Sequence, residues 1–400
     1  MDKPLSPTPL NPLLLDTGSP PIPEARGWAA AYTGAHGPLI DLSQGAPGEA
    51  PPDSLLAALQ AATALPAAAR YGAIEGDAPL RESLARDIHR SGGADLRPAD
   101  ICITAGCNQA YFAVVMALAR AGDNIILPAP WYFNHEMTLR MLGIEARALP
   151  CSAADGFVPD VAEAEALIDD RTRAIVLVTP NNPTGAVYSS ATLRAFAEMA
   201  ARRGIRLLLD ETYRDFLPDG QAHAHDLFAT SHWRQSVIGL YSFSKAYAVP
   251  GWRMGAIMAD HALIPEIAKV LDCVQISPVR AAQMALAPAV EETRLWREAT
   301  RARINARGDV FRETIDALPP VGNQRWQVLS SGAYFAYLAH PFEGVDASRI
   351  GQILAQTHGV LMLPGPYFGP GQQRHLRVAM ANVSEPAIRD AVGRLAGLRI

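Results

Sequence analysis

Two short segments of the chain carry side chains that could take part in covalent catalysis. Ser242-Phe-Ser-Lys245 follows an apolar run, and Arg253 lies eight residues beyond the lysine. Asp210 and Tyr213 follow another apolar run. A lysine amine that is neutral for part of the time can attack a carbonyl group, and an arginine can bind a phosphate through two hydrogen bonds. The two segments therefore supply a nucleophile, a carboxylate, a phenol and an anion-binding group.

Two further segments add an amide and backbone donors. The run 101–104 continues into Ala-Gly106-Cys107-Asn108, where we expect a helix to begin. The first backbone N–H groups of a helix are free to bind a phosphate, and the helix dipole assists. Asn182 lies within Asn-Asn-Pro-Thr-Gly after the run 174–179, a composition that is also typical of an ordinary turn. Cys107 is interpreted as a small loop residue and not as a nucleophile.

The elements that position these segments alternate along the chain. Short apolar runs at 101–104, 124–127, 174–179, 205–210 and 237–241 are separated by segments of helical length. Such runs are typical of a mainly parallel sheet that helices cover on both faces. Ligands bind outside the carboxyl ends of the strands in sheets of this kind. All four polar segments follow a strand, so the sequence predicts an α/β fold with one site at this edge.

The length of the chain predicts two domains, because 400 residues exceed what one hydrophobic core usually supports. We expect residues 1–50 to form an N-terminal arm and part of a small domain. Residues 51–284 are predicted to form the large domain with the sheet, and residues 285–400 a smaller α+β domain. The Pro-rich residues 1–26 are predicted to be extended, and residues 332–338 are predicted to form one strand.

The composition argues against several classes of protein. A formal net charge of −5 gives no reason to expect nucleic acid or an anionic membrane as a partner. No run reaches 18 apolar residues, and the N-terminal residues do not have the layout of a signal peptide. The four cysteines lie far apart without metal-ligand spacing, so we expect reduced thiols, no metal and a cytoplasmic location.

Taken in order, the motifs resemble those of the class I and II aminotransferases, the pyridoxal 5′-phosphate (PLP) enzymes of fold type I. The resemblance extends from Gly45 to Arg377 and is most specific at Ser242-x-Ser-Lys245 with Arg253. It implies the aspartate aminotransferase fold, with a mainly parallel, seven-stranded sheet in a large domain and a smaller α+β domain. It also implies ping-pong transamination between an L-amino acid and a 2-oxo acid, with PLP bound covalently to Lys245.

The resemblance implies cofactor contacts for most of the polar residues. Asp210 would hold the protonated pyridine nitrogen, which keeps the ring an electron sink. Asn182 and Tyr213 would bind the phenolate oxygen of the ring. The phosphate would be bound by residues of three segments: Gly106, Cys107, Asn108, Ser242 and Arg253.

An aromatic residue would stack on the PLP ring in this family. Spacing from Pro130 favours Tyr132, whereas alignment from Met137 favours Trp131. Both assignments stay open at this point. His135 is interpreted either as support behind the ring or as a buried histidine of the core.

Two residues outside these segments are implied to bind the substrate. Arg377 would bind the α-carboxylate, because a guanidinium fork suits a carboxylate. Gly45 would line the same pocket, together with Asn182. Tyr71 would reach the phosphate of the neighbouring subunit, which implies a homodimer with shared active sites.

The amino donor is left open by the sequence. Dicarboxylate-specific relatives often use a second arginine from the partner subunit, in the region before a Ser-x-Pro element. Here the corresponding residues 271–278 contain no arginine, and Arg280 is displaced. This argues against aspartate or glutamate as the dedicated donor and leaves neutral, aromatic and basic amino acids. A PLP-dependent lyase or decarboxylase is the main alternative on the same fold. A PLP-binding regulator would need an N-terminal DNA-binding module, for which the short arm has no room.

Overall fold

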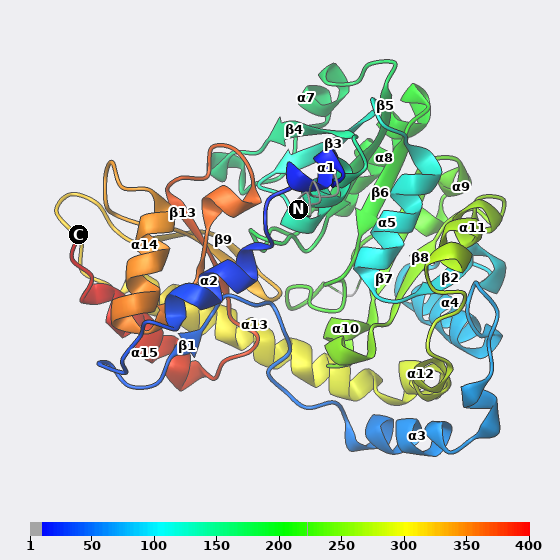
Figure 1. Cartoon of the computed structure of the whole chain (residues 1–400), viewed down its shortest axis with the longest axis horizontal. Helices are drawn as coiled ribbons and strands as arrows, with labels where there is room; N and C mark the ends of the chain where they lie inside the picture. The colour runs from blue at the N-terminus through cyan, green and yellow to red at the C-terminus, as the bar shows by residue number, and fades with distance from the viewer. Residues whose placement is uncertain (1–9, 222) are drawn as a thin grey trace, which may run out of the picture.

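The computed structural model describes residues 10–221 and 223–400. Its largest element is a seven-stranded sheet in the order β2-β8-β7-β6-β5-β3-β4 (Figure 1). All neighbouring strands pair in parallel except those that pair with β8, which is antiparallel. The strands are β2 Ile101–Thr104, β3 Asn124–Ala129, β4 Glu145–Pro150, β5 Thr172–Val178, β6 Arg206–Asp210, β7 Val237–Ser242 and β8 Gly255–Met258.

Helices cover both faces of this sheet because its side chains alternate between two buried clusters. On one face, Ile175, Leu207 and Leu209 join a cluster with α3, α4, α8 and α12. On the other, Val176 and Leu208 join a cluster with α5, α6 and α11. The first group of helices spans Asp53–Thr63, Ala78–Gly92, Ser190–Arg203 and Arg280–Glu292, and the second Cys107–Leu118, Phe133–Met141 and Ile264–Val274. Three short helices complete this part: α7 Val161–Ala166, α9 Trp233–Ser236 and α10 Phe243–Ala246.

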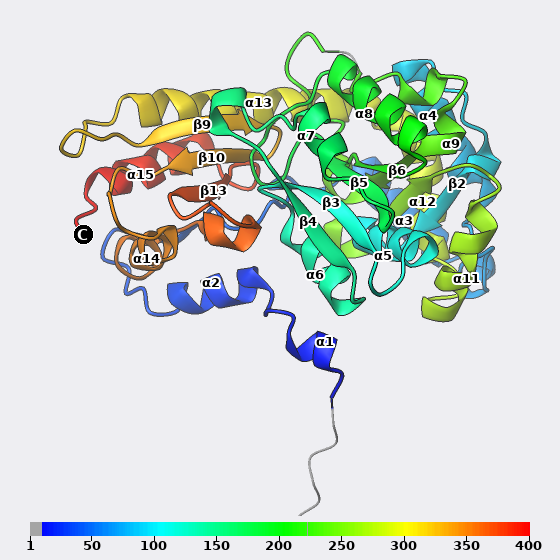
Figure 2. The ribbon, with the colours of Figure 1, turned by 90° about the horizontal axis from the view of Figure 1, so that it is seen from above.

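A second, four-stranded antiparallel sheet has the order β12-β13-β10-β9. Its strands are β9 Gln327–Gly332, β10 Phe335–Ala339, β12 Leu363–Pro364 and β13 His375–Ala379. Three helices pack on it, α13 Arg294–Asp316, α14 Ala347–Ile353 and α15 Glu385–Ala396. Figure 2 shows α13 extending beside both parts of the molecule. The predicted α/β fold with a smaller α+β part is confirmed, whereas the domain boundaries near residues 50 and 284 stay predictions.

Two local predictions were wrong. Residues 332–338 do not form one strand, because β9 ends at Gly332 and β10 begins at Phe335. Residues 1–9 of the segment predicted to be extended lie outside the described residues, and the rest is not extended throughout, since it contains α1, Pro12–Leu15, and α2, Pro21–Ala29. Proline is tolerated in the first turn of a helix. Burial of Ala25 with residues of the smaller sheet then stabilises α2, a tertiary contact that the sequence pattern does not reveal.

The N-terminal segment and the two sheets meet at a few close backbone contacts. Strand β1, Ile40–Asp41, pairs in parallel with β11, Val360–Leu361, and so brings residues 41–45 toward the large sheet. Gly185, after β5, has a φ of +76°, and a Cβ there would lie 2.6 Å from the Phe335 carbonyl oxygen. Only glycine permits this approach. None of the helices in residues 10–221 and 223–400 has the length and apolar character needed to cross a membrane.

Candidate active site

A cavity of about 270 Å³ lies at the carboxyl ends of β5, β6 and β7. It brings together most of the residues that the sequence singled out. Arg377, Gly45 and Gly106 adjoin it, because they contact Asn182, Lys245 and Arg253 respectively. The lining residues are Gln44, Cys107, Asn108, Tyr132, Val178, Asn182, Asp210, Thr212, Tyr213, Ser242, Ser244, Lys245, Pro250 and Arg253.

Lys245 lies in α10, directly after β7, where Ser242 caps the helix by accepting a hydrogen bond from the Ser244 N–H. Its Nζ donates a 2.7 Å hydrogen bond to the Gly45 carbonyl oxygen. Burial lowers the pKa of Lys245 to about 8, and the positive charges of Arg253 and Arg377 contribute. A substantial fraction of this amine is therefore neutral at mildly alkaline pH.

Asp210, at the end of β6, is buried and receives three contacts. His135 Nε2 lies 3.3 Å from Oδ2, while the Thr212 N–H donates to Oδ1 over 3.0 Å and Cys107 Sγ lies 3.6 Å from the same oxygen. Burial alone would raise the pKa of Asp210, but the contacts with His135 and Thr212 outweigh it and lower the pKa. The carboxylate therefore stays charged, and His135 is placed beside it instead of in an unrelated part of the core.

An anion cradle is formed by the first turn of α5 and by Arg253. Helix geometry leaves the backbone N–H groups at Cys107 and Asn108 without partners in the helix. A Cβ at Gly106 would lie 2.9 Å from Arg253 Cζ, so glycine allows the guanidinium to lie against this turn. Arg253 itself has a φ of +54°, a conformation that non-glycine residues adopt rarely and mostly at functional sites.

Arg377, on β13, is a buried guanidinium that forms no ion pair with any described residue. It donates to Asn182 Oδ1 over 3.2 Å and to the Ser43 carbonyl oxygen. Its Nε is buried without a partner, and the Phe335 and Phe368 rings lie 4.9 and 5.2 Å from Cζ. Burial lowers the pKa of Arg377 to about 10, so the side chain is charged at neutral pH. A buried positive charge without a carboxylate is suited to an anionic ligand.

The structure distinguishes the two aromatic candidates. Tyr132 lines the cavity, and its hydroxyl oxygen accepts a 2.7 Å hydrogen bond from Asn134. Trp131 instead packs against Gly369, where a Cβ would lie 3.1 Å from the indole ring. Tyr132 is therefore the aromatic residue that faces the site.

The surroundings of three other candidate residues, Cys107, Arg280 and Tyr71, indicate whether each can act in the active site of its own chain. Burial raises the pKa of the Cys107 thiol well above its ordinary value, which agrees with its interpretation as a non-nucleophilic residue. Arg280 binds Asp77 over 3.2 Å and the Ala67 carbonyl oxygen over 2.8 Å. Tyr71 is 79% exposed and does not line the cavity of its own chain.

Sequence reasoning missed several residues of the site. Gln44 and Thr212 lie next to predicted residues, so their positions in the chain could have indicated them. Ser43 contributes only its carbonyl oxygen to Arg377, for which no residue type is diagnostic. Phe335 and Phe368 come from distant segments of the smaller sheet region, and their sequence pattern indicates only a core.

Comparison with known proteins identifies the family. The model of the family described as aminotransferase class I and II matches residues 37–395. The chain belongs to this family. Class I and II aminotransferases of this fold are PLP enzymes, so the protein is a PLP-dependent aminotransferase, which transfers an amino group between an amino acid and a 2-oxo acid.

Relatives of this aminotransferase have several specificities. An aromatic aminotransferase of Arabidopsis thaliana is 28% identical over 388 residues, which cover 95% of this chain and 94% of the relative. The aspartate/prephenate aminotransferase of Thermus thermophilus is 30% identical over 364 residues, 90% of each chain. An arginine–pyruvate transaminase of Pseudomonas aeruginosa is 29% identical over 326 residues, 82% of this chain and 81% of the relative.

Solved structures agree in fold over nearly the whole chain. A double mutant of the Thermus thermophilus aspartate aminotransferase superposes with a TM-score of 0.89 at 27% identity, covering 98% of this chain and 99% of that chain. The aspartate aminotransferase of Rhizobium meliloti also gives a TM-score of 0.89, at 24% identity and 98% coverage of each chain, and shows likeness in fold.

The residues of this aminotransferase fit PLP. A charged, buried Asp210 suits the pyridinium nitrogen, and the cradle of α5 and Arg253 suits the phosphate. Lys245 lies within the same cavity with an amine whose pKa is about 8. The carboxylate, the lysine amine and the anion cradle that Gly106 permits therefore match the pyridinium nitrogen, the aldehyde and the phosphate of PLP.

The pKa of Lys245 predicts how the protein without cofactor captures added PLP. Only the neutral amine attacks the aldehyde, so the capture rate is expected to rise with pH and to be half-maximal near pH 8. Stopped-flow absorbance at a series of pH values would measure it. Nα-acetyl-lysine is the reference, because its amine has the ordinary lysine pKa of about 10.4. A midpoint near 10 in the protein would contradict the prediction.

Proposed function

We propose that Lys245 holds PLP and transfers the substrate proton, and that Arg377 binds the substrate α-carboxylate. The buried guanidinium of Arg377, which has no acidic partner among the described residues, is the observation that carries the proposal. Its present acceptors are an amide oxygen and a backbone carbonyl oxygen. A carboxylate would replace the Ser43 carbonyl oxygen and add an ion pair with the bidentate geometry that suits a guanidinium.

The cofactor contacts follow from the same arrangement. Asp210 would pair with the pyridinium nitrogen, and Asn182 and Tyr213 would bind the phenolate oxygen. Tyr132 would stack on the ring, supported by its position in the cavity. The phosphate would be bound by residues around the first turn of α5: Gly106, Cys107, Asn108, Ser242 and Arg253.

PLP, when bound, supplies an electron sink for the electrons left at the substrate Cα. The chain positions and moves the proton. Arg377 fixes the α-carboxylate, and Asn182 holds the guanidinium in place by accepting a hydrogen bond from it. Lys245, whose Nζ is oriented by the Gly45 carbonyl oxygen, takes the proton from Cα and later releases it as a general acid. A pKa of about 8 suits both directions of transfer at near-neutral pH.

We propose a neutral or aromatic L-amino acid as the donor. Within the described part of the chain, the arginine and lysine side chains lining the cavity are Lys245 and Arg253, both assigned to the cofactor. Arg280, which follows Ser277-Pro278 in the sequence, is engaged by Asp77 and by the Ala67 carbonyl oxygen. The aromatic aminotransferase among the relatives is consistent with this donor class.

A donor panel tests the proposal. The purified holoenzyme is incubated with single L-amino acids without an acceptor, and pyridoxamine phosphate is quantified. Phenylalanine, tyrosine, leucine and methionine are expected to give pyridoxamine phosphate faster than aspartate and glutamate. Faster reaction with aspartate would overturn the donor class, and loss of the amino acid without pyridoxamine phosphate would instead indicate a lyase.

We also propose a homodimer in which Tyr71 reaches the phosphate of the partner subunit. The segments 65–72 and 274–280 lie side by side, because the Gly72 N–H donates to Ser277 Oγ. They expose apolar surface beside the α5 cradle, where Gln109 binds Gln275 over 3.0 Å. The exposed apolar residues are Leu65, Tyr71, Val274, Ile276 and Val279. Sedimentation of the holoenzyme as a monomer at micromolar concentration would contradict the proposal.

A cytoplasmic location is proposed as well. All four cysteines are free thiols in the structure, and disulfides are rare in the cytosol. Fractionation of the native cells, with recovery of the protein outside the cytoplasm, would overturn this assignment.

A further inference from the structure

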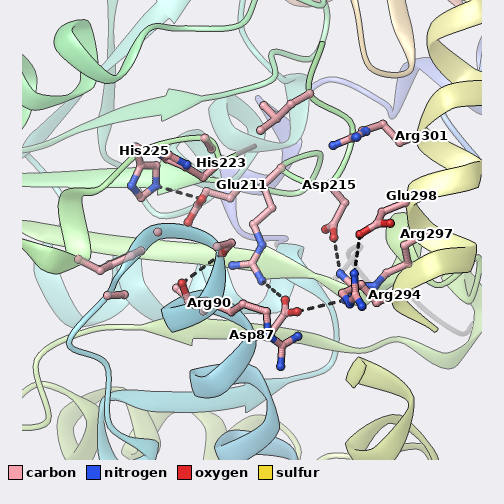
Figure 3. A pocket seen from close by; sticks show the side chains of 18 residues that line it. Asp87, Arg90, Glu211, Asp215, His223, His225, Arg294, Arg297, Glu298 and Arg301 are labelled. Carbon is pink, nitrogen blue, oxygen red and sulfur yellow. Dashed lines mark hydrogen bonds and ion pairs between the residues drawn. The ribbon is translucent and has the colours of Figure 1, made fainter. Parts of the chain in front are cut away.

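A second cavity lies apart from the active site, between α4, the segment after β6, and α13 (Figure 3). Its volume is about 280 Å³, near the lower end of small-molecule sites, which range over roughly 300–1,000 Å³. None of its lining residues lines the active-site cavity. The two are joined through the chain, because Glu211 of this cavity directly follows Asp210 of the active site.

Most charged side chains of this cavity satisfy one another. Arg297 binds Asp87 over 3.1 Å and Asp215 over 2.6 Å. Arg294 binds Glu298 over 3.1 Å, and Figure 3 shows these contacts at the side of the cavity formed by α13. The residues in these ion pairs already have partners of opposite charge. What the cavity can bind therefore depends on the charged residues that are not in such pairs.

Glu211 is one of two charged lining residues that form no arginine–carboxylate ion pair with a described residue, although the buried Nε of Arg297 also lacks a partner. The carboxylate is 3% exposed, and its Oε2 has no hydrogen-bond partner among the described residues. Its Oε1 contacts His225 Nε2 over 3.0 Å. Because His225 Nδ1 accepts a hydrogen bond from the Leu227 N–H, the imidazole is neutral with its hydrogen on Nε2. This histidine therefore does not balance the negative charge of Glu211. The buried cation whose charge acts on Glu211 is Arg214, which forms its ion pair with Asp87 over 3.4 Å.

Arg301 is the second of these two residues. It extends from α13 into the cavity, and no described residue forms an ion pair or hydrogen bond with it (Figure 3). Its Nε is buried without a partner. A buried carboxylate on one wall and an unpaired guanidinium on another would suit a ligand that carries both an ammonium and a carboxylate.

We propose that this cavity is a second amino-acid site, which binds the zwitterion with its ammonium on Glu211 and its carboxylate on Arg301. The remaining wall includes Ile88, Leu217 and Phe228, which favour an apolar side chain. A bound amino acid contacts the turn that begins at Asp210. An amino acid bound there could therefore alter the position of the turn at Asp210, which is proposed to bind the cofactor, without entering the active site.

The test uses holoenzyme whose active site is blocked. The aminooxy group of aminooxyacetate displaces the Lys245 amine from PLP and forms a stable oxime. Excess reagent is then removed, and loss of transamination confirms the block. Isothermal titration with L-leucine, L-methionine and L-phenylalanine is then expected to show one site per chain for at least one of them. If none of the three bound at concentrations up to about 10 mM, the proposal would be overturned. A dissociation constant of 10 mM corresponds to a binding free energy of only about −2.7 kcal/mol.

Two variants and two analogues decide whether the site is the one proposed. Arg301→Met and Arg301→Glu are expected to weaken binding by about tenfold or more, since each removes a charge-assisted contact. Arg303→Met is the matched control, because Arg303 lies on the same helix and outside the cavity. Unchanged binding in both Arg301 variants would overturn the assignment. So would 4-methylpentanoate or isoamylamine, each with one charge of leucine, binding as tightly as leucine.

Discussion

Lys245→Ala is expected to lower the rate of transamination by about 10²–10⁴-fold, the scale on which a positioned acid–base group contributes. The variant loses both the covalent attachment of PLP and the group that moves the proton at Cα. No second lysine lines the described cavity to replace it. Pyridoxamine phosphate formation in single-turnover reactions measures the chemical step, and mass spectrometry after borohydride reduction shows whether PLP is attached to the chain.

The control separates these losses from a general effect of removing a lysine. Lys269→Ala removes an exposed lysine of α11 that pairs only with Glu266 on the surface, so full activity and PLP attachment are expected. Circular dichroism of both variants checks that the fold persists. Retention of more than a tenth of the activity in Lys245→Ala, with PLP still attached after reduction, would refute the assignment.

The large sheet and most of the site could be predicted from the sequence because the signals are local. Continuous apolar runs mark strands that are buried on both faces, and polar residues directly after them must gather at one edge. Lys245, Asp210 and Asn182 each follow such a run, and the cavity contains all three. The order of the strands was not needed to reach this conclusion.

The rest depends on contacts between distant segments. Trp131 and Tyr132 stand side by side before α6, and only packing of Trp131 on Gly369 separates their roles. Ser43 and Gly45 contribute backbone carbonyl oxygens to Arg377 and Lys245, and side-chain type does not encode such acceptors. Likewise, α2 is held by apolar contacts to the smaller sheet region, which periodicity in a Pro-rich segment does not indicate.

These distant contacts have a common consequence. The segment 43–45, which β1 and β11 anchor beside the smaller sheet, provides acceptors both for the substrate-binding candidate Arg377 and for Lys245. Its carbonyl groups accept hydrogen bonds from the buried Arg377 and from the partly buried Lys245. A substrate carboxylate would replace the Ser43 acceptor at Arg377, so binding and proton transfer involve the same short segment.

Arg377→Leu is therefore expected to lower kcat/KM for the amino acid by about 10²- to 10³-fold, the range for truncating one partner of a buried charge pair. Arg377→Lys is expected to recover part of this loss, because it restores the charge without the guanidinium fork. PLP attachment and absorbance should persist in both, since the cofactor contacts proposed above do not include this residue. Initial rates over a range of donor concentrations measure the effect.

Arg374→Leu is the matched control for this prediction. Arg374 lies just before β13 and donates to the His340 carbonyl oxygen, away from the cavity, so its loss should leave kcat/KM within about twofold of the parent. If Arg377→Leu kept the parental kcat/KM for every donor, the carboxylate would have to bind elsewhere. If it lost PLP as well as activity, Arg377 would act on the cofactor site, either directly or through Asn182, to which it donates a hydrogen bond.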